Sequence, residues 1–177
     1  MLKTKTTNRK SVALGIYPHP KAIGFALMDS PTTIKESGYC YSSAKNKESY
    51  VRHIANMIRL HKPTVIILEH KDSRNQHRLN QMKYIFEEIE KVVHQLDYPL
   101  VQYSRKKIRT VFGNANKPEI AEALSEKFTD YKSRLPKKRQ FDSAESTKMC
   151  EFDALSLVYT HFHHEQQKLS MLGGGTS

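Results

Sequence analysis

Residues 12–28, VALGIYPHPKAIGFALM, place two apolar runs on either side of a short polar interruption. Both runs, 12–16 and 23–27, are rich in β-prone residues, and turn-forming residues separate them, so the stretch predicts a β-hairpin. After the turn DSPTT, the segment from Ile34 to Tyr41 alternates in the manner of a strand. Three successive strands of this kind predict an antiparallel meander.

The rest of the chain alternates helices with two further strands. The unbroken apolar run 65–68 predicts a buried strand that ends on Glu69, and 100–103 is predicted to be a fifth strand. Apolar residues recur at helical spacing elsewhere, and the predicted helices are 47–61, 79–96, 105–112, 118–128 and 146–166. We therefore predict one α/β domain at 12–166, with a mixed five-stranded sheet, a flexible basic arm at 1–11 and a flexible tail at 167–177.

Composition indicates the partner. The 177 residues carry 29 lysines and arginines against 18 aspartates and glutamates, a formal net charge of +11. Clustered cations neutralise phosphates and release counterions, so nucleic acid is the predicted partner, with a solvated charged face as the alternative. The apolar runs are too short to cross a bilayer, and residues 1–10 lack the apolar core of a signal peptide. These features predict a cytoplasmic protein that does not bind membranes.

Two basic clusters are candidates for contact with DNA. The first lies in the predicted helix 105–112 and comprises Arg105, Lys106, Lys107 and Arg109. The second lies in the segment 131–139, predicted to be a loop, and comprises Lys132, Arg134, Lys137, Lys138 and Arg139. Together they could line a phosphate-binding groove, and the alternative is a solubilising charged surface.

Aromatic and histidine side chains have more ordinary interpretations. Tyr39 and Tyr41 on the third strand could stack on a base, but packing on the sheet face is favoured. Among His161, His163 and His164, only the first and last share a helix face, and no cysteine or carboxylate partner is evident. Helix-end packing or an interaction with the helix dipole is therefore favoured over a zinc site.

Two carboxylates stand at notable positions. Glu69 ends a buried strand, where an unpaired charge is costly, so it either binds a cation or pairs with a basic neighbour such as His70 or Lys71. Asp153 follows Phe152 at the start of an apolar helix, and taken alone it is a charge that the helix dipole stabilises. In sheets of this kind, ligands and metals gather at the carboxyl ends of neighbouring strands.

Four segments, in order, resemble the RuvC-like Holliday-junction resolvases of the ribonuclease H-like superfamily. These segments are ALGIYPHPKAIGFALMD (13–29), KPTVIILEH (62–70), RKKIRTVFGNANKPEIAEAL (105–124) and EFDALSLVYTHF (151–162). The resemblance implies a ribonuclease H-like fold and cleavage of branched DNA by two magnesium ions, held about 4 Å apart by carboxylates. It also suggests a homodimer, because resolvases cut two symmetric strands.

The resemblance assigns roles by position. Glu69 would be the carboxylate of the second acidic strand, and Asp153 that of the last helix. Where the family has its leading aspartate, this chain has Tyr17, which is neutral at physiological pH and a poor magnesium ligand. Cys150 stands three positions before Asp153, where many resolvases have another acid. The favoured hypothesis is a protein that recognises structured or branched DNA with a degenerate two-metal nuclease site.

The alternative is an active endodeoxyribonuclease that depends on Mg²⁺ or Mn²⁺ and uses a substituted metal ligand. The candidate substitutes are His19, Asp29, Asp72 and Glu151. His19 is nearest to Tyr17, and its nitrogen favours manganese or zinc over magnesium. A sugar-kinase-like or actin-like ATPase is disfavoured, because residues 17–22 contain no glycine for a phosphate loop and the chain has no room for a second domain.

Overall fold

The structure, a computed structural model, describes residues 11–70, 76–137 and 145–173, with the backbone alone at 76–81. In chain order the elements are β1 (Ala13–His19), β2 (Ala22–Ser30), β3 (Thr33–Tyr41), α1 (Lys47–His61), β4 (Val65–Glu69), α2 (Gln76–Gln95), β5 (Leu100–Tyr103), α3 (Arg105–Val111), α4 (Lys117–Lys127), the 3₁₀ helix η1 (Thr129–Arg134) and α5 (Met149–Gly173). The strand order is β3-β2-β1-β4-β5. β2 pairs antiparallel with β1 and β3, whereas β4 pairs parallel with β1 and β5. The predicted mixed five-stranded α/β fold is confirmed.

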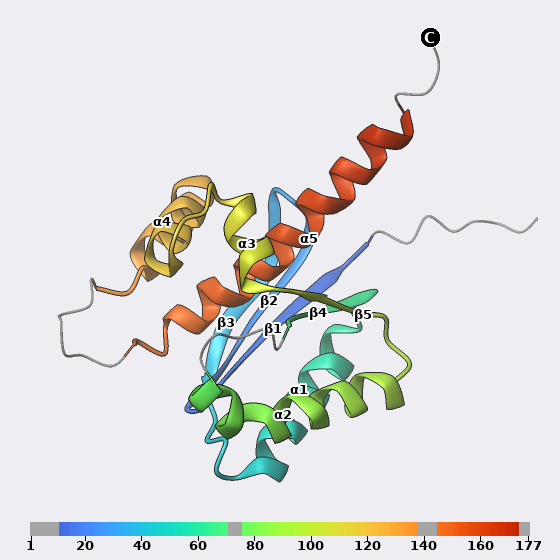
Figure 1. Cartoon of the computed structure of the whole chain (residues 1–177), viewed down its shortest axis with the longest axis vertical. Coiled ribbons are helices and arrows are strands. Elements are labelled where there is room, and N and C mark those ends of the chain that lie inside the picture. The colour runs from blue at the N-terminus through green and yellow to red at the C-terminus, as the bar shows by residue number, and fades with distance from the viewer. Residues whose placement is uncertain (1–10, 71–75, 138–144, 174–177) are drawn as a thin grey trace, which may run out of the picture.

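Helices cover both faces of this sheet (Figure 1). α1 and α2 pack on one face, where Leu14, Ile16 and Ile66 are buried. α5 covers the other face, where Tyr17 and Ile67 are buried, and α3 and α4 pack against α5. Successive side chains of a strand point to opposite faces, so β1 and β4 supply both layers of the core. This double burial explains why both strands are continuous apolar runs in the sequence.

Two glycines allow α5 to lie directly against β1 and β2. A Cβ atom on Gly15 would come within 2.6 Å of the Ala154 carbonyl oxygen. A Cβ atom on Gly24 would overlap the Cys150 carbonyl group and lie 2.8 Å from the Cys150 Cβ. Because Gly24 pairs with Tyr17 across the hairpin, this close approach brings the first turns of α5 next to Tyr17.

Some boundaries differ from the sequence-based prediction. α5 continues to Gly173, whereas the predicted helix ended at Gln166 and was followed by a flexible tail at 167–177. Residues 167–172 are mostly good helix formers, and the helix ends only at the glycine run. Part of the predicted 131–139 loop belongs to η1. Residues 1–10 of the predicted arm lie outside the described residues. Among the described residues, no helix combines the length and the apolar character that a bilayer crossing needs.

Two histidines connect α5 to β5. The Tyr103 hydroxyl and His161 Nδ1 are hydrogen-bonded at 3.2 Å, and the His164 ring stacks on Tyr103 with centroids 5.4 Å apart. Burial lowers the pKa of both imidazoles, and the charge of Lys168 acts in the same direction. The carboxylate of Glu165 opposes this effect at His161 without cancelling it. Both rings are therefore held in the neutral form, as helix-end packing predicts.

We expect the protein to lose stability as the pH falls below about 6.5, the ordinary histidine pKa. In this range the imidazoles of the unfolded chain bind protons, whereas those of the folded protein stay neutral because their pKa is lowered. The stabilisation is therefore complete above the pKa of the unfolded state and declines below it. Urea unfolding at about pH 7.5 and about pH 5.5 measures this loss. The loss should be smaller in His161→Gln than in the exposed control His53→Gln. Equal losses would contradict a role for His161.

Candidate functional site

The structure brings Tyr17, Glu69 and Asp153 together at one edge of the sheet. Tyr17 lies near the end of β1, and Glu69 is the last residue of the parallel neighbour β4. Asp153 faces them from the second turn of α5 and is 4% exposed, while Tyr17 is 5% exposed. The resemblance predicted these three positions as a group, and the parallel pairing of β1 and β4 is the reason that they meet.

Arg105 connects the two carboxylates. Its Nε donates to Glu69 Oε1 at 2.9 Å, its Nη2 pairs with Glu69 Oε2, and its Nη1 donates to Asp153 Oδ1 at 3.3 Å. The pairing with Glu69 is bidentate, which is the strongest geometry available to a carboxylate and a guanidinium. Arg105 is the first residue of α3, which Ser104 caps by accepting from Lys107 N at 3.2 Å. Glu69 therefore pairs with a basic residue that is distant in sequence, and Lys71, one of the predicted partners, lies outside the described residues.

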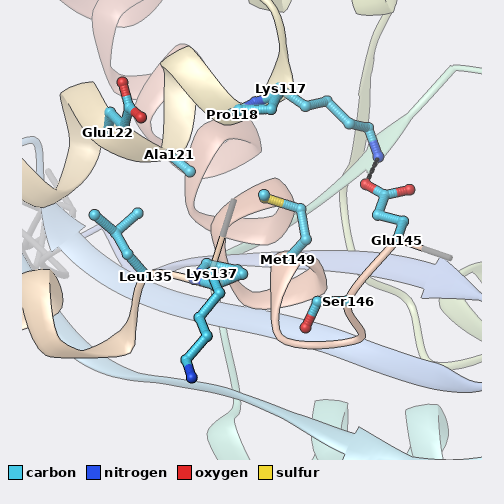
Figure 2. A pocket seen from close by; sticks show the side chains of 10 residues that line it. Lys117, Pro118, Ala121, Glu122, Leu135, Lys137, Glu145, Ser146 and Met149 are labelled. Atoms are coloured by element: carbon cyan, nitrogen blue, oxygen red, sulfur yellow. Dashed lines mark hydrogen bonds and ion pairs between the residues drawn. The ribbon is translucent and has the colours of Figure 1, made fainter. Parts of the chain in front are cut away.

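Lys117 is the second cation of the site. Its Nζ donates to Asp153 Oδ2 at 2.9 Å, to the Tyr17 hydroxyl at 2.9 Å and to Glu145 Oε1 at 3.0 Å (Figure 2 shows the pair with Glu145). The Nζ atom also lies 4.8 Å from the centroid of the Tyr17 ring, within range of a cation–π interaction. Three contacts use all three ammonium protons, so Lys117 holds β1, α5 and the segment before α5 together.

Both cations keep their protons. Burial disfavours the charged form of Lys117, but nearby charges, chiefly that of Asp153, outweigh burial and raise its pKa above the ordinary lysine value. The same balance applies to Arg105, where the charges of Asp153 and Glu69 raise the pKa. The cluster therefore contains two permanent positive charges beside the carboxylates of Glu69, Asp153 and Glu145.

These residues do not fit a two-magnesium centre in this arrangement. Both oxygens of Glu69 and both oxygens of Asp153 accept from Arg105 or Lys117. Tyr17 supplies a phenol where a bridging carboxylate would be needed, and magnesium prefers carboxylate oxygens and water. Within the described ranges, no three histidine, cysteine, aspartate or glutamate side chains are grouped in a way that could hold a metal ion.

The candidate substitute ligands lie elsewhere or have other partners. Glu151 is buried and its Oε1 accepts from Ser37 Oγ at 2.6 Å and from Arg134 Nη1 at 2.7 Å, which ties α5 to β3 and η1. His19 Nδ1 accepts from Lys21 N at 3.2 Å.

Asp29 lies at the end of β2 opposite to Gly24, the residue that pairs with Tyr17, so the length of the strand separates Asp29 from Tyr17. Its Oδ2 is 3.5 Å from Lys35 Nζ. Asp72 lies outside the described residues. The structure therefore does not bring Glu151 or Asp29 to the carboxylate pair.

The predicted DNA-binding residues divide into three groups. Lys106, Lys107, Lys132 and Lys137 are exposed at the surface. Arg105 faces the carboxylates, Arg134 pairs with Glu151, and Arg109 donates to the carbonyl oxygens of Asn114 and Ala115, so these three support the fold. Lys138 and Arg139 lie outside the described residues.

Sequence reasoning did not single out Lys117 or Glu145 as site residues. Lys117 directly follows the N-cap Asn116, which forms a capping box with Glu119: Asn116 Oδ1 accepts from Glu119 N at 3.1 Å, and Glu119 Oε2 accepts from Asn116 N at 2.7 Å. A lysine at a helix N-terminus opposes the helix dipole. That unfavourable placement is a signal in the sequence that Lys117 has another partner. Glu145 carries no comparable signal.

A pocket of about 360 Å³ adjoins the ion pairs (Figure 2). Its apolar lining comes from α4, the segment after η1 and the start of α5, through Pro118, Ala121, Leu135, Pro136 and Met149. Lys117 and Glu145 form the side toward the carboxylates, and Lys137 lies on another side. The ion pairs are therefore next to an open, partly apolar depression.

Comparison with solved structures identifies the architecture. The chain is similar to Thermus thermophilus RuvC in complex with a Holliday junction substrate, with a TM-score of 0.67, 12% identity, and coverage of 89% of this chain and 96% of that chain. It is also similar to a second Thermus thermophilus RuvC structure (TM-score 0.65, 13% identity, coverage 88% and 96%). The yeast mitochondrial Holliday junction resolvase Ydc2 gives a TM-score of 0.59 at 12% identity, with coverage of 92% and 81%.

No protein-family model and no curated protein matches the sequence. The mixed sheet and its flanking helices match the ribonuclease H-like fold of RuvC. Within that class the chain has the fold of the RuvC-like resolvases, which confirms the resemblance noted in the four sequence segments.

Proposed function

We propose that this protein binds structured or branched DNA on a RuvC-like scaffold whose metal centre has become an internal ion-pair network. The observation that carries the proposal is the pairing of Glu69 and Asp153 with Arg105 and Lys117 beside Tyr17. The two cations are placed where divalent ions would otherwise neutralise the carboxylates. A nuclease of this class needs those ions to activate water and to stabilise the leaving oxygen.

The nature of residue 17 favours this interpretation. A neutral phenol can accept a hydrogen bond from the Lys117 ammonium, and its ring adds a cation–π contact with the same group. An aspartate at this position would add a third carboxylate to the pair formed by Glu69 and Asp153 and would favour a divalent ion. Tyr17 therefore suits a site that a lysine occupies better than a site that two metals occupy.

Charge and fold support the proposed partner. The net charge of +11 and the exposed lysines Lys106, Lys107, Lys132 and Lys137 provide cations that can neutralise phosphates. The RuvC structure to which the chain is similar is a complex with a Holliday junction substrate. We include Lys138 and Arg139 in the proposed DNA surface. We also propose that the protein forms a homodimer whose two-fold symmetry matches that of a junction.

The test combines a gel shift with a cleavage assay on a labelled four-way DNA junction, in magnesium and then in manganese. We expect the unaltered protein to shift the junction more strongly than a linear duplex of the same sequence and to leave both uncut. The double variant Lys106→Ala, Lys107→Ala should bind more weakly. The slope of log affinity against log salt concentration should fall by about 1 for each phosphate that the lysines no longer neutralise. The exposed Lys83→Ala on α2 is the matched control and should bind as the unaltered protein does.

Two results would overturn the proposal. Junction cleavage by the unaltered protein that disappears in Glu69→Gln would establish the alternative, an active metal-dependent endodeoxyribonuclease. Failure of the unaltered protein to shift either the junction or the linear duplex would remove DNA as the partner. Cleavage that appears only in Tyr17→Asp would support the proposal, because it would show that the scaffold cuts DNA once a carboxylate replaces the phenol.

A further inference from the structure

An exposed tyrosine that takes no part in the ion-pair network ends β3. Tyr41 is 72% exposed, whereas Tyr39, two residues earlier on the same side of the strand, packs against the core under α5. The two ring centroids are 5.6 Å apart and the ring planes make an angle of 86°, so the edge of one ring meets the face of the other. The favoured prediction of sheet-face packing therefore holds for Tyr39, but Tyr41 presents its ring to solvent.

The Tyr41 hydroxyl is influenced by Tyr39 and by the segment before α5. A hydrogen bond with the Thr147 side chain and another with Tyr39 lower the pKa of the Tyr41 hydroxyl, and the positive charge of Lys148 acts in the same direction. Tyr39 itself packs against the buried cluster that includes Cys150.

The register of the sheet places this pair near the candidate site. Tyr39 pairs with Gly24, and Gly24 pairs with Tyr17. Two interstrand spacings separate Tyr39 from Tyr17, which is about 10 Å across the sheet. Both side chains lie on the face that α5 covers. The Cys150 backbone of α5 packs on Gly24 between them, and β3, which carries Tyr41, is the outer strand on this side of the sheet.

Two lysines belong to segments that adjoin the end of β3. Lys148 lies close enough to influence the Tyr41 hydroxyl. The carbonyl oxygen of Lys21, in the turn between β1 and β2, accepts from Ser42 N at 3.2 Å, so this turn lies beside the end of β3. Lys21 and Lys148 are both exposed. An aromatic ring next to lysines is the combination that proteins use to bind unpaired nucleotides, because the ring stacks on a base and the cations neutralise the phosphates.

We propose that Tyr41 is a stacking platform for an unpaired nucleobase, with Lys148 and Lys21 beside the adjoining phosphates. This inference rests on the proposed DNA-binding function and names the feature of the DNA that is recognised, an unpaired base near a branch or a bulge. Tyr84 on α2 provides a contrast within the same chain. Its ring is 45% exposed, but the Lys47 ammonium lies over it at 4.4 Å from the centroid, so a cation already occupies that face.

The chain contains no tryptophan, so Tyr41→Trp introduces a single fluorescent reporter at the platform. The probes are a DNA duplex with one unpaired thymine, the same duplex fully paired, and the bulged duplex with an abasic site in place of the thymine. We expect the bulged duplex to quench the emission of Tyr41→Trp more than the other two do. Tyr84→Trp is the matched control, and its emission should respond equally to all three.

Affinity measurements complete the test. Tyr41→Ala should weaken binding of the bulged duplex about tenfold, a loss in the range found when a stacking aromatic is truncated. Tyr41→Phe should retain this affinity, because the ring and not the hydroxyl makes the stack, and Tyr84→Ala should bind as the unaltered protein does. Neither the paired nor the abasic duplex should distinguish Tyr41→Ala from the unaltered protein.

The possible failures are distinguishable. If the unaltered protein shifts the four-way junction but Tyr41→Trp shows no selective quenching, the platform is wrong and the proposed function stands. If Tyr41→Ala weakens binding of all three duplexes equally, Tyr41 supports general affinity and the base-stacking role is wrong. If the unaltered protein binds neither junction nor duplex, the proposed function fails and the platform fails with it.

Discussion

A Lys117→Met protein is expected to lose about 3 kcal/mol of unfolding free energy, within the range for removing one partner of a buried ion pair. The Asp153 carboxylate is 4% exposed, and it would lose the ammonium that lies 2.9 Å away. Arg105 remains 3.3 Å from the other oxygen, which places the loss at the lower end of that range. The measurement is the free energy of urea unfolding of the variant and of the unaltered protein.

The matched control is Lys127→Met at the other end of α4. Lys127 is exposed and its Nζ lies 5.2 Å from the Tyr159 ring centroid, so its loss should cost less than about 1 kcal/mol. A Lys117→Met protein as stable as this control would show that Lys117 does not stabilise the carboxylates.

Manganese provides a second measurement on the same proteins. It should raise the melting temperature of Lys117→Met more than that of the unaltered protein, because the vacated carboxylate oxygens are ligands for a divalent ion. An equal or larger rise in the unaltered protein would mean that its cations do not exclude metal.

A Gly24→Ala protein is expected to lose at least about 3 kcal/mol of unfolding free energy, the upper part of the range for overpacking a core. The added methyl group would overlap the Cys150 carbonyl group, which is backbone inside α5 and cannot rotate away as a side chain would. Either α5 moves away from β2 or the hairpin distorts. Both changes would also separate Asp153 from Tyr17, so the pairing of Lys117 with these two groups would weaken.

Gly38→Ala on β3 is the comparison for this substitution. A Cβ at Gly38 would lie 3.3 Å from Phe25 Cε1, the edge of a side chain that can shift by a few tenths of an ångström. Its cost should be below about 1 kcal/mol, as for most substitutions away from close-packed sites. Chemical denaturation of the two variants, side by side with the unaltered protein, measures the difference. Similar costs for Gly24 and Gly38 would contradict the close approach of α5 to β2.

Local sequence patterns were enough to predict the architecture. Two apolar runs separated by YPHPKA specify a hairpin, and the change from period-two to helical spacing after Lys47 marks the end of the meander. These patterns are local, because each strand or helix must bury its own apolar side chains, and so they can be found without knowing the partners. The helix boundaries were less well defined by the sequence, since the helix-forming residues 167–172 extend α5 beyond its buried part.

The resemblance of four sequence segments to RuvC-like resolvases singled out Glu69, Asp153 and Tyr17 as a group. What neutralises the two acids depends on tertiary packing. Arg105 was predicted among the lysines and arginines that could contact DNA, yet its guanidinium faces Glu69, 36 positions earlier in the chain. Lys117 reaches Tyr17 across 100 positions. Such pairings depend on how α3, α4 and α5 pack over the sheet, and no local pattern encodes the distance between two charges on different elements.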